Sequence, residues 1–203
     1  MSGGNGRETG FHFTPETLER AKAFVARYPK GRQASAVVPI LDLAQRQSGG
    51  WLPHAALDYV AEFLGMAPIR VYEVATFYTM LNLKPVGRHH VQVCTTTPCW
   101  LCGSDAIVKA CEEELGIRPG GRTGDGAFSL IEVECLGACV NGPVVQINDD
   151  YYEDLDGESV RKILAALKRG ERPKPGSQTG RQTSAPASGP KTLQSLEGAD
   201  AKR

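Results

Sequence analysis

Six cysteines are the residues of this sequence best suited to chemistry, and four of them form two spaced pairs. Cys135 and Cys139 share a short segment in which Gly137 lets the backbone curl tightly, and a turn sequence follows. Cys94 and Cys99 form the other pair, directly after a short apolar run. Thiols so close on bent segments serve as metal or cluster ligands or as a redox pair. We therefore expect these four cysteines to hold one binuclear iron–sulfur cluster.

A second ligand set is compatible with the same sequence. Cys94, Cys99 and Cys102 reproduce the C-x4-C-x2-C spacing of plant-type ferredoxins, with Cys135 available as the fourth ligand. This choice is less favoured, because Cys102 adjoins the start of the next expected helix and would point away from the loop. It would also leave Cys139 with nothing to bind.

Other uses of the thiols are possible. Four cysteines are a common structural zinc set, although zinc sites usually combine C-x2-C units and neither preferred pair has that spacing. Cys99-Trp-Leu-Cys102 is a C-x-x-C sequence of the kind found in thiol oxidoreductases, but three more cysteines lie nearby. Cys111 falls within an apolar helical pattern, which predicts a small buried hydrophobic residue.

Composition and missing motifs exclude several function classes. With 23 basic and 23 acidic residues, the chain has no electrostatic reason to bind nucleic acid or an anionic membrane. It contains no apolar run of membrane-spanning length and no signal segment, so we expect a reducing compartment. The four histidines lack Rieske spacing, the glycines of 116–126 match no nucleotide-binding motif, and no complete active site stands out.

The first half of the chain has a helical hydrophobic period. We expect four amphipathic helices, over 15–28, 35–47, 53–64 and from 68 to about 81. The apolar residues expected on the fourth helix are Val71, Val74, Phe77, Tyr78 and Leu81. Thr14 and Pro15 form a capped helix start, whereas Pro39 must lie in the first turn of the second helix. Residues 11–86 are therefore expected to form a small helical bundle.

After residue 86 the period changes, and we expect an α/β domain over 87–169. Its expected strands cover 89–94, 129–134, 144–148 and about 151–153, and its helices cover 104–115 and 157–168. Both cysteine pairs follow a strand, and Cys99 is expected on a loop. The expected fold class is α+β.

The two ends of the chain have little apolar content. Residues 1–10 and 170–203 are expected to be disordered, because they cannot bury enough surface to offset the entropy of ordering. Leu193 and Leu196 are the large apolar residues of the second segment, and weak docking on a partner is the less favoured interpretation.

Several stretches resemble a known family. The sequence from Asp125 through Phe128-Ser129 to Cys135-Leu-Gly-Ala-Cys139 and Gly142-Pro143 is similar to the signature of the 24-kDa-type subunit of respiratory complex I, known in bacteria as the E subunit. Supporting stretches are 43–45, 71–78 and 93–99. The resemblance runs from about residue 11 to 168.

This resemblance implies a helical bundle followed by a thioredoxin-like domain with one [2Fe-2S] cluster on Cys94, Cys99, Cys135 and Cys139. It implies electron transfer within NADH:quinone oxidoreductase, with FMN and NADH bound by a partner flavoprotein subunit and other hydrophilic subunits nearby. The complex would place the chain peripherally on the cytoplasmic side of the inner membrane, or on the matrix side in mitochondria. NAD-linked hydrogenases and formate dehydrogenases use similar subunits, which is the alternative.

Overall fold

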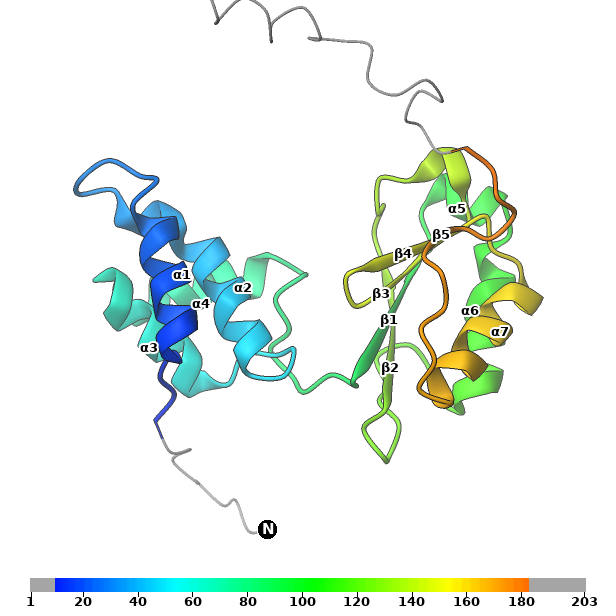
Figure 1. Ribbon diagram of the computed structural model, residues 1–203, viewed down its shortest axis with the longest axis horizontal. Coiled ribbons are helices and arrows are strands. Elements are labelled where there is room, and N and C mark those ends of the chain that lie inside the picture. Colours follow the sequence, from blue (N-terminus) through cyan, green and yellow to red (C-terminus); the bar gives the residue numbers. More distant parts are fainter. Residues whose placement is uncertain (1–9, 183–203) are drawn as a thin grey trace, which may run out of the picture. The chain divides into compact units, whose positions relative to one another are not determined.

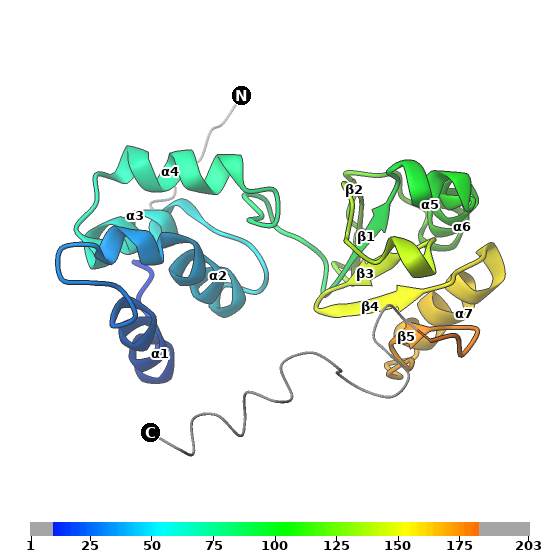
Figure 2. The ribbon, with the colours of Figure 1, turned by 90° about the horizontal axis from the view of Figure 1, so that it is seen from above.

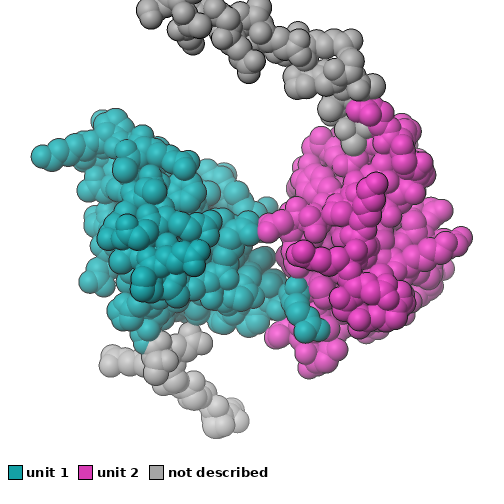
Figure 3. Space-filling model, in the orientation of Figure 1, with its two compact units in different colours: residues 1–88 teal, residues 89–203 magenta. Residues whose placement is uncertain are grey.

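The computed structural model describes residues 10–182 and divides into two compact units, Met1–Arg88 and His89–Arg203 (Figure 3). Each unit is treated by itself below. Residues 1–9 and 183–203, which belong to the two segments expected to be disordered, lie outside the described residues, as do Leu193 and Leu196.

The first unit is helical. Its elements are α1 (Pro15–Val25), the 3-10 helix η1 (Gln33–Ala36), α2 (Val37–Gln47), α3 (His54–Leu64) and α4 (Pro68–Phe77). The Thr14 side chain caps α1 by accepting a hydrogen bond from the Thr17 amide at 3.2 Å. Because η1 precedes α2, Pro39 is the third residue of the helix, where its missing N–H breaks no intrahelical bond.

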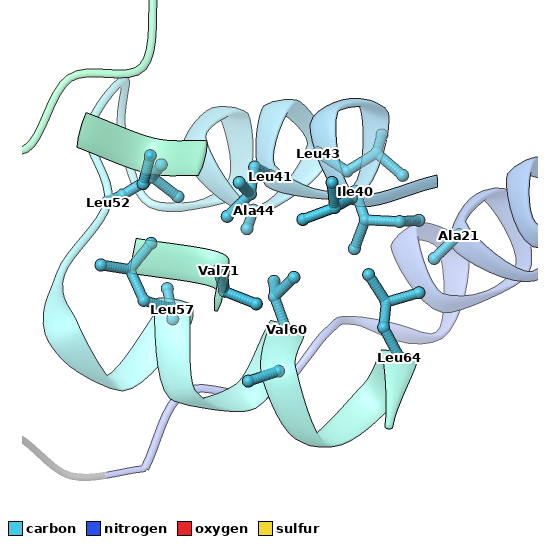
Figure 4. Packing of buried hydrophobic residues seen from close by; sticks show 14 of the residues in the cluster. Ala21, Ile40, Leu41, Leu43, Ala44, Leu52, Leu57, Val60, Leu64 and Val71 are labelled. Atoms are coloured by element: carbon cyan, nitrogen blue, oxygen red, sulfur yellow. The ribbon is translucent and has the colours of Figure 1, made fainter. Parts of the chain in front are cut away.

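Apolar residues from the four α-helices meet in one core (Figure 4). Ile40, Leu41 and Val60 are fully buried there, together with Val71 of α4. The helical period of the sequence therefore identified the inward faces of these helices. The last turn of α4 does not follow the expected helical pattern. The helix ends at Phe77, because Tyr78 has an extended backbone.

Phe77 and Tyr78 were expected on the apolar stripe of the fourth helix, and that expectation is wrong. Phe77 is 77% exposed and Tyr78 is 40% exposed. The segment continues as turns, and Leu81 returns to the core. Two aromatic residues are therefore left at the surface of the first unit.

The second unit combines a sheet with helices (Figure 1). Its elements are β1 (His89–Cys94), α5 (Thr97–Leu101), α6 (Ser104–Leu115), β2 (Phe128–Val133), η2 (Cys139–Asn141), β3 (Val145–Ile147), β4 (Asp150–Glu153), α7 (Gly157–Lys168) and β5 (Gly176–Ser177). The sheet has five strands in the order β2-β1-β3-β4-β5. β1 pairs in parallel with β2, and β4 with β5, whereas β3 is antiparallel to both neighbours.

Helices α6 and α7 lie together on one face of this sheet (Figures 1 and 2). The fully buried Val91 and Leu130 of the sheet share a core with Ile107 of α6 and Leu164 of α7. α7 begins with a capping box, in which the Ser159 amide donates to Asp156 at 2.7 Å. The α+β class, with a mixed sheet in this unit, is confirmed.

The segment after α7 differs from the disorder expected from residue 170. Gly176 and Ser177 pair with Tyr152 and Glu153 of β4, and the Gln178 amide donates to the Glu153 carbonyl at 3.0 Å. The backbone of β4 thus provides the order that the composition of the segment does not predict. No helix within residues 10–182 is both long and apolar enough to cross a lipid bilayer.

Candidate metal centre

The parallel pairing of β1 with β2 brings the two cysteine segments to one edge of the sheet. Cys94, the last residue of β1, is paired with Val133, the last residue of β2, and Cys135 follows two residues later. Parallel strands end at the same edge, so the loops after β1 and β2 must meet there. Segments that are far apart in the sequence therefore supply neighbouring thiols.

The first pair is buried. Cys94 is 1% exposed and Cys99 is 2% exposed, and both pack against Val144 just before β3. Cys99 lies in the short helix α5, which corrects the expectation that it lies on a loop. Pro98 at the second position of α5 is compatible with this first turn, because the amide it lacks has no intrahelical partner.

The second pair is exposed. The Sγ atoms of Cys135 and Cys139 lie 3.4 Å apart, and the Gly137 amide donates to Cys135 Sγ at 3.4 Å. Gly137 has φ +80°, in the left-handed region that glycine adopts readily. The tight bend expected between these cysteines is therefore present, with a backbone donor aimed at sulfur.

The ionisation of the thiols reflects these contacts. Burial raises the pKa of Cys94, but hydrogen bonds from the Thr96 hydroxyl and from the backbones of Leu136 and Thr96 outweigh it, so the pKa is lowered. Burial and the neighbouring Cys94 thiol raise the pKa of Cys99 to about 12. The two thiols of the buried pair therefore differ in acidity, because the pKa of Cys94 is lowered and that of Cys99 is raised.

The two pairs also affect each other. The neighbouring Cys135 thiol raises the pKa of Cys139, and the charge of Cys94 adds to the increase. Cys139 in turn contributes to the raised pKa of Cys99. Coulomb interactions therefore link Cys139 of the exposed pair to both thiols of the buried pair.

Neighbouring side chains hold the two loops in place. The Tyr151 hydroxyl donates to the Leu136 carbonyl at 2.9 Å, between the two cysteines of the exposed pair. The buried Asn141 donates to Asp154 at 2.6 Å. A β-carbon built on Gly142 would lie 3.5 Å from Cys99 Sγ, so this glycine brings the backbone after Cys139 against the buried pair.

Sequence reasoning missed these supporting residues. Tyr151 and Asp154 contact residues more than ten positions away, and no local spacing indicates such contacts. Asn141 was assigned only a turn, although it is fully buried. The turn residues after Cys139 were the one sequence feature that pointed to these contacts. A turn that leads back into a strand needs side chains elsewhere in the fold to hold it.

The two remaining cysteines have different surroundings. Cys102 is exposed and caps the C-terminus of α5. Cys111 is fully buried in the core between α6 and the sheet, and burial raises its pKa to about 12. The interpretation of Cys111 as a small buried hydrophobic residue agrees with this position.

The chemistry of the four thiols fits a two-iron cluster. They lie in two contacting pairs, Cys94 with Cys99 and Cys135 with Cys139. Within residues 10–182, no three His, Cys, Asp or Glu side chains are grouped as ligands of one metal ion. A two-iron cluster takes four thiolates, and backbone hydrogen bonds to the sulfurs tune it.

Comparisons with known proteins agree with this chemistry. Residues 21–168 match the family model described as thioredoxin-like [2Fe-2S] ferredoxin. The E subunit of NADH-quinone oxidoreductase from Rickettsia bellii is 59% identical over 164 residues, which are 81% of this chain and 98% of the relative. A mitochondrial NADH dehydrogenase [ubiquinone] flavoprotein 2 of Dictyostelium discoideum is 50% identical, over 93% of this chain and 76% of the relative.

The fold also occurs in a solved structure. An NAD+-reducing [NiFe]-hydrogenase in the air-oxidized state aligns with 64% of this chain and 23% of its own chain, with TM-score 0.56 and 21% identity. This similarity concerns the fold alone. The expected family resemblance and the thioredoxin-like fold are thus confirmed.

Proposed function

The chain belongs to the thioredoxin-like [2Fe-2S] ferredoxin family, among the E subunits of NADH-quinone oxidoreductase, and from this premise we propose its role and its ligands. It carries one [2Fe-2S] cluster and transfers electrons within an NADH-oxidising oxidoreductase complex. Cys94, Cys99, Cys135 and Cys139 hold the cluster.

The observation that carries the ligand proposal is the meeting of two cysteine pairs at one edge of the sheet. Cys94 and Cys135 leave parallel, adjacent strands, and each is followed within five residues by a second thiol. When bound, the cluster accepts and returns one electron.

Backbone donors of the chain face two of the four sulfurs, those of Cys94 and Cys135. The Gly137 amide donates to Cys135 Sγ, and backbone hydrogen bonds from Thr96 and Leu136 favour the thiolate of Cys94. Donors fixed in a loop need no reorganisation when the charge on sulfur changes. These fixed donors are therefore compatible with gain and loss of an electron without movement of the loops.

We assign the FMN and the NADH-binding site to a partner flavoprotein subunit. Five large apolar side chains between residues 69 and 83 are exposed, and they support a docking role for the first unit because exposed apolar surface is common at interaction sites. They are Ile69, Phe77, Tyr78, Met80 and Leu83. Docking on the hydrophilic subunits of complex I would keep the chain peripheral to the membrane, on its cytoplasmic or matrix side.

Single Cys→Ser replacements test the ligand assignment. Cys102→Ser should keep the visible absorption of the cluster and its iron content, because this side chain lies outside the proposed set. Cys94→Ser and Cys139→Ser should each remove or strongly change the absorption. Loss of the cluster in Cys102→Ser with retention in Cys139→Ser would favour the plant-type set. Anaerobically prepared wild-type protein without iron and inorganic sulfide would refute the proposed function.

Double replacement of the exposed aromatics tests docking. Phe77→Ser with Tyr78→Ser should reduce co-purification of the FMN-containing subunit and leave the cluster absorption unchanged. Tyr28→Ser is the matched control, since Tyr28 is 37% exposed but lies outside this segment. Equal retention of flavin by the double variant and the control would contradict the assigned surface.

A further inference from the structure

The residues after α7 contact the turn that carries Cys139. We call residues 176–181 the strap. Its first two residues form β5 beside β4, which fixes the path of the chain. The strap then reaches η2, the short helix that begins at Cys139. It lies beyond residue 168, where the match to the family model ends.

Asp154 is the centre of this contact. Its side chain is 8% exposed, and its backbone has φ +53°. It accepts hydrogen bonds from Asn141 Nδ2 at 2.6 Å, from Ser177 Oγ at 2.5 Å and from Arg181 Nε at 3.1 Å. One carboxylate therefore joins the strap to η2.

Arg181 joins the same elements through a second route. Its Nη2 donates to the Val140 carbonyl at 2.7 Å and to Asp154 Oδ1 at 2.5 Å. Val140 directly follows Cys139, and the Asp154 amide donates to the Asn141 carbonyl at 2.8 Å. The backbone on the C-terminal side of Cys139 is thus held at two successive carbonyls.

This arrangement differs from an ordinary surface ion pair. Arg169 and Glu171 form such a pair, with side chains 59% and 55% exposed. Exposed pairs contribute little to stability, whereas hydrogen bonds between a buried carboxylate and several donors are costly to break. Burial raises the pKa of Asp154, but the bonds from Arg181, Ser177 and Asn141 lower it to about 2.

We propose that the strap positions the Cys139 turn for cluster binding, with Arg181 and Asp154 as the positioning residues. The proposal rests on the proposed function, because it assumes that Cys139 is a ligand. Arg181 and Asp154 do not touch the cluster in this role. They limit how often the turn moves Cys139 out of position, and a displaced thiolate would let water or a chelator take its place on iron.

The rate of cluster loss tests the proposal. The full-length protein is prepared anaerobically with its cluster, and the decay of visible absorption is followed in the presence of an iron chelator. Arg181→Gln and Asp154→Asn should each accelerate the decay roughly tenfold, since each breaks charge-assisted bonds to the turn. The decay rate of Arg181→Lys should lie between those of wild type and Arg181→Gln. The lysine ammonium group keeps the positive charge but lacks the planar pair of donors of the guanidinium group. Arg169→Gln should match wild type.

Two further measurements separate positioning from a general loss of structure. Hydrogen exchange of amides 135–142 in the cluster-free chain should be faster in Arg181→Gln, while exchange in α6 and α7 is unchanged. A chain ending at Gln182 keeps every strap contact and should retain its cluster as the full chain does. A chain ending at Pro175 should lose it as fast as Arg181→Gln.

The outcomes distinguish the two proposals. Decay rates of Arg181→Gln and Asp154→Asn within twofold of wild type would overturn the role of the strap, even though the cluster is present. Equal acceleration in Arg169→Gln would overturn it as well. A wild-type chain without iron would instead refute the cluster assignment. If Asp154→Asn fails to fold, the decay rate of Arg181→Gln alone tests the proposal. The Arg181 side chain is 54% exposed, so its replacement should not prevent folding.

Discussion

Replacement of Gly137 by alanine should weaken cluster retention through backbone strain alone. Gly137 has φ +80°, and a β-carbon added there would meet no heavy atom within 4 Å. Steric collision is therefore absent, and the whole effect comes from forcing a β-carbon into the left-handed region. That conformation costs an L-residue about 1–2 kcal/mol.

The strain is released when the turn opens, so it should appear in the opening equilibrium. A change of 1–2 kcal/mol corresponds to a factor of roughly 5–30. We expect Gly137→Ala to lose its visible absorption faster by that factor in anaerobic buffer with a chelator. The melting of α6 and α7 by far-UV circular dichroism should change little, because the strain is local to the Cys135–Cys139 turn.

Two matched variants make the reasoning refutable. Asparagine tolerates the left-handed region better than alanine, so Gly137→Asn should recover much of the retention. Gly124 also has open space around its β-carbon position, but its φ lies outside the left-handed range. Gly124→Ala should therefore leave the rate unchanged. Equal rates of cluster loss for Gly137→Ala and Gly124→Ala would refute the strain argument. If Gly137→Asn lost its cluster as fast as Gly137→Ala, the cause would be a steric clash of the added side chain in the turn.

Three further predictions concern charge and burial. Since Asp154 has its pKa lowered from 3.8 to about 2, its stabilisation is complete above pH 4 and is lost as the pH falls toward 2. The ionised Asp154 contributes on the order of 1–2 kcal/mol to the free energy of unfolding, once the solvent screening of the exposed Arg181 is taken into account. The free energies of unfolding of wild type and Asp154→Ala, measured by urea titration, should therefore converge at low pH. Cys111→Ser buries a hydroxyl in an apolar core and should reduce the free energy of unfolding by about 1–2 kcal/mol in urea without altering the cluster spectrum; an unchanged free energy would indicate that the helix backbone accepts the hydroxyl. Glu134→Gln removes an exposed negative charge beside Cys135 and should raise the reduction potential by roughly a few tens of mV at low salt; an unchanged redox titration would show that the charge is screened.

The sequence predicted the elements that have a strong period. β1, α6 and α7 have the expected bounds, because each combines a clear hydrophobic pattern with a cap or a turn. The five-residue helix α5 was missed, because one turn and a half is too short for a period to be read. β5 was missed for another reason: its Gly-Ser pair has no strand propensity, and only the backbone of β4 recruits it.

The proposed ligands of the candidate site come from local features of the sequence, whereas the contacts that support them do not. Cysteine spacing and the strand before each pair are local features, and they were enough to select four thiols. The contacts of Tyr151 with Leu136 and of Arg181 with Val140 join residues 15 and 41 positions apart. Such contacts follow from the order of strands in the sheet, which a hydrophobic period does not encode. Phe77 is a further case that hydrophobic spacing does not predict. Helical spacing does not show where a helix ends, so it placed this residue on the core-facing side although the helix ends there.

With the proposed ligands, the parallel pairing of β1 with β2 would also give the cluster a mechanical role. About 40 residues separate Cys94 from Cys135, and a cluster held by both, as proposed, would close this span as a disulfide does. By chain-entropy arguments, such a cross-link disfavours the unfolded chain by about 4 kcal/mol. On the proposed ligand set, the resistance of the second unit to unfolding would therefore depend on the supply of iron and sulfide as well as on its hydrophobic core.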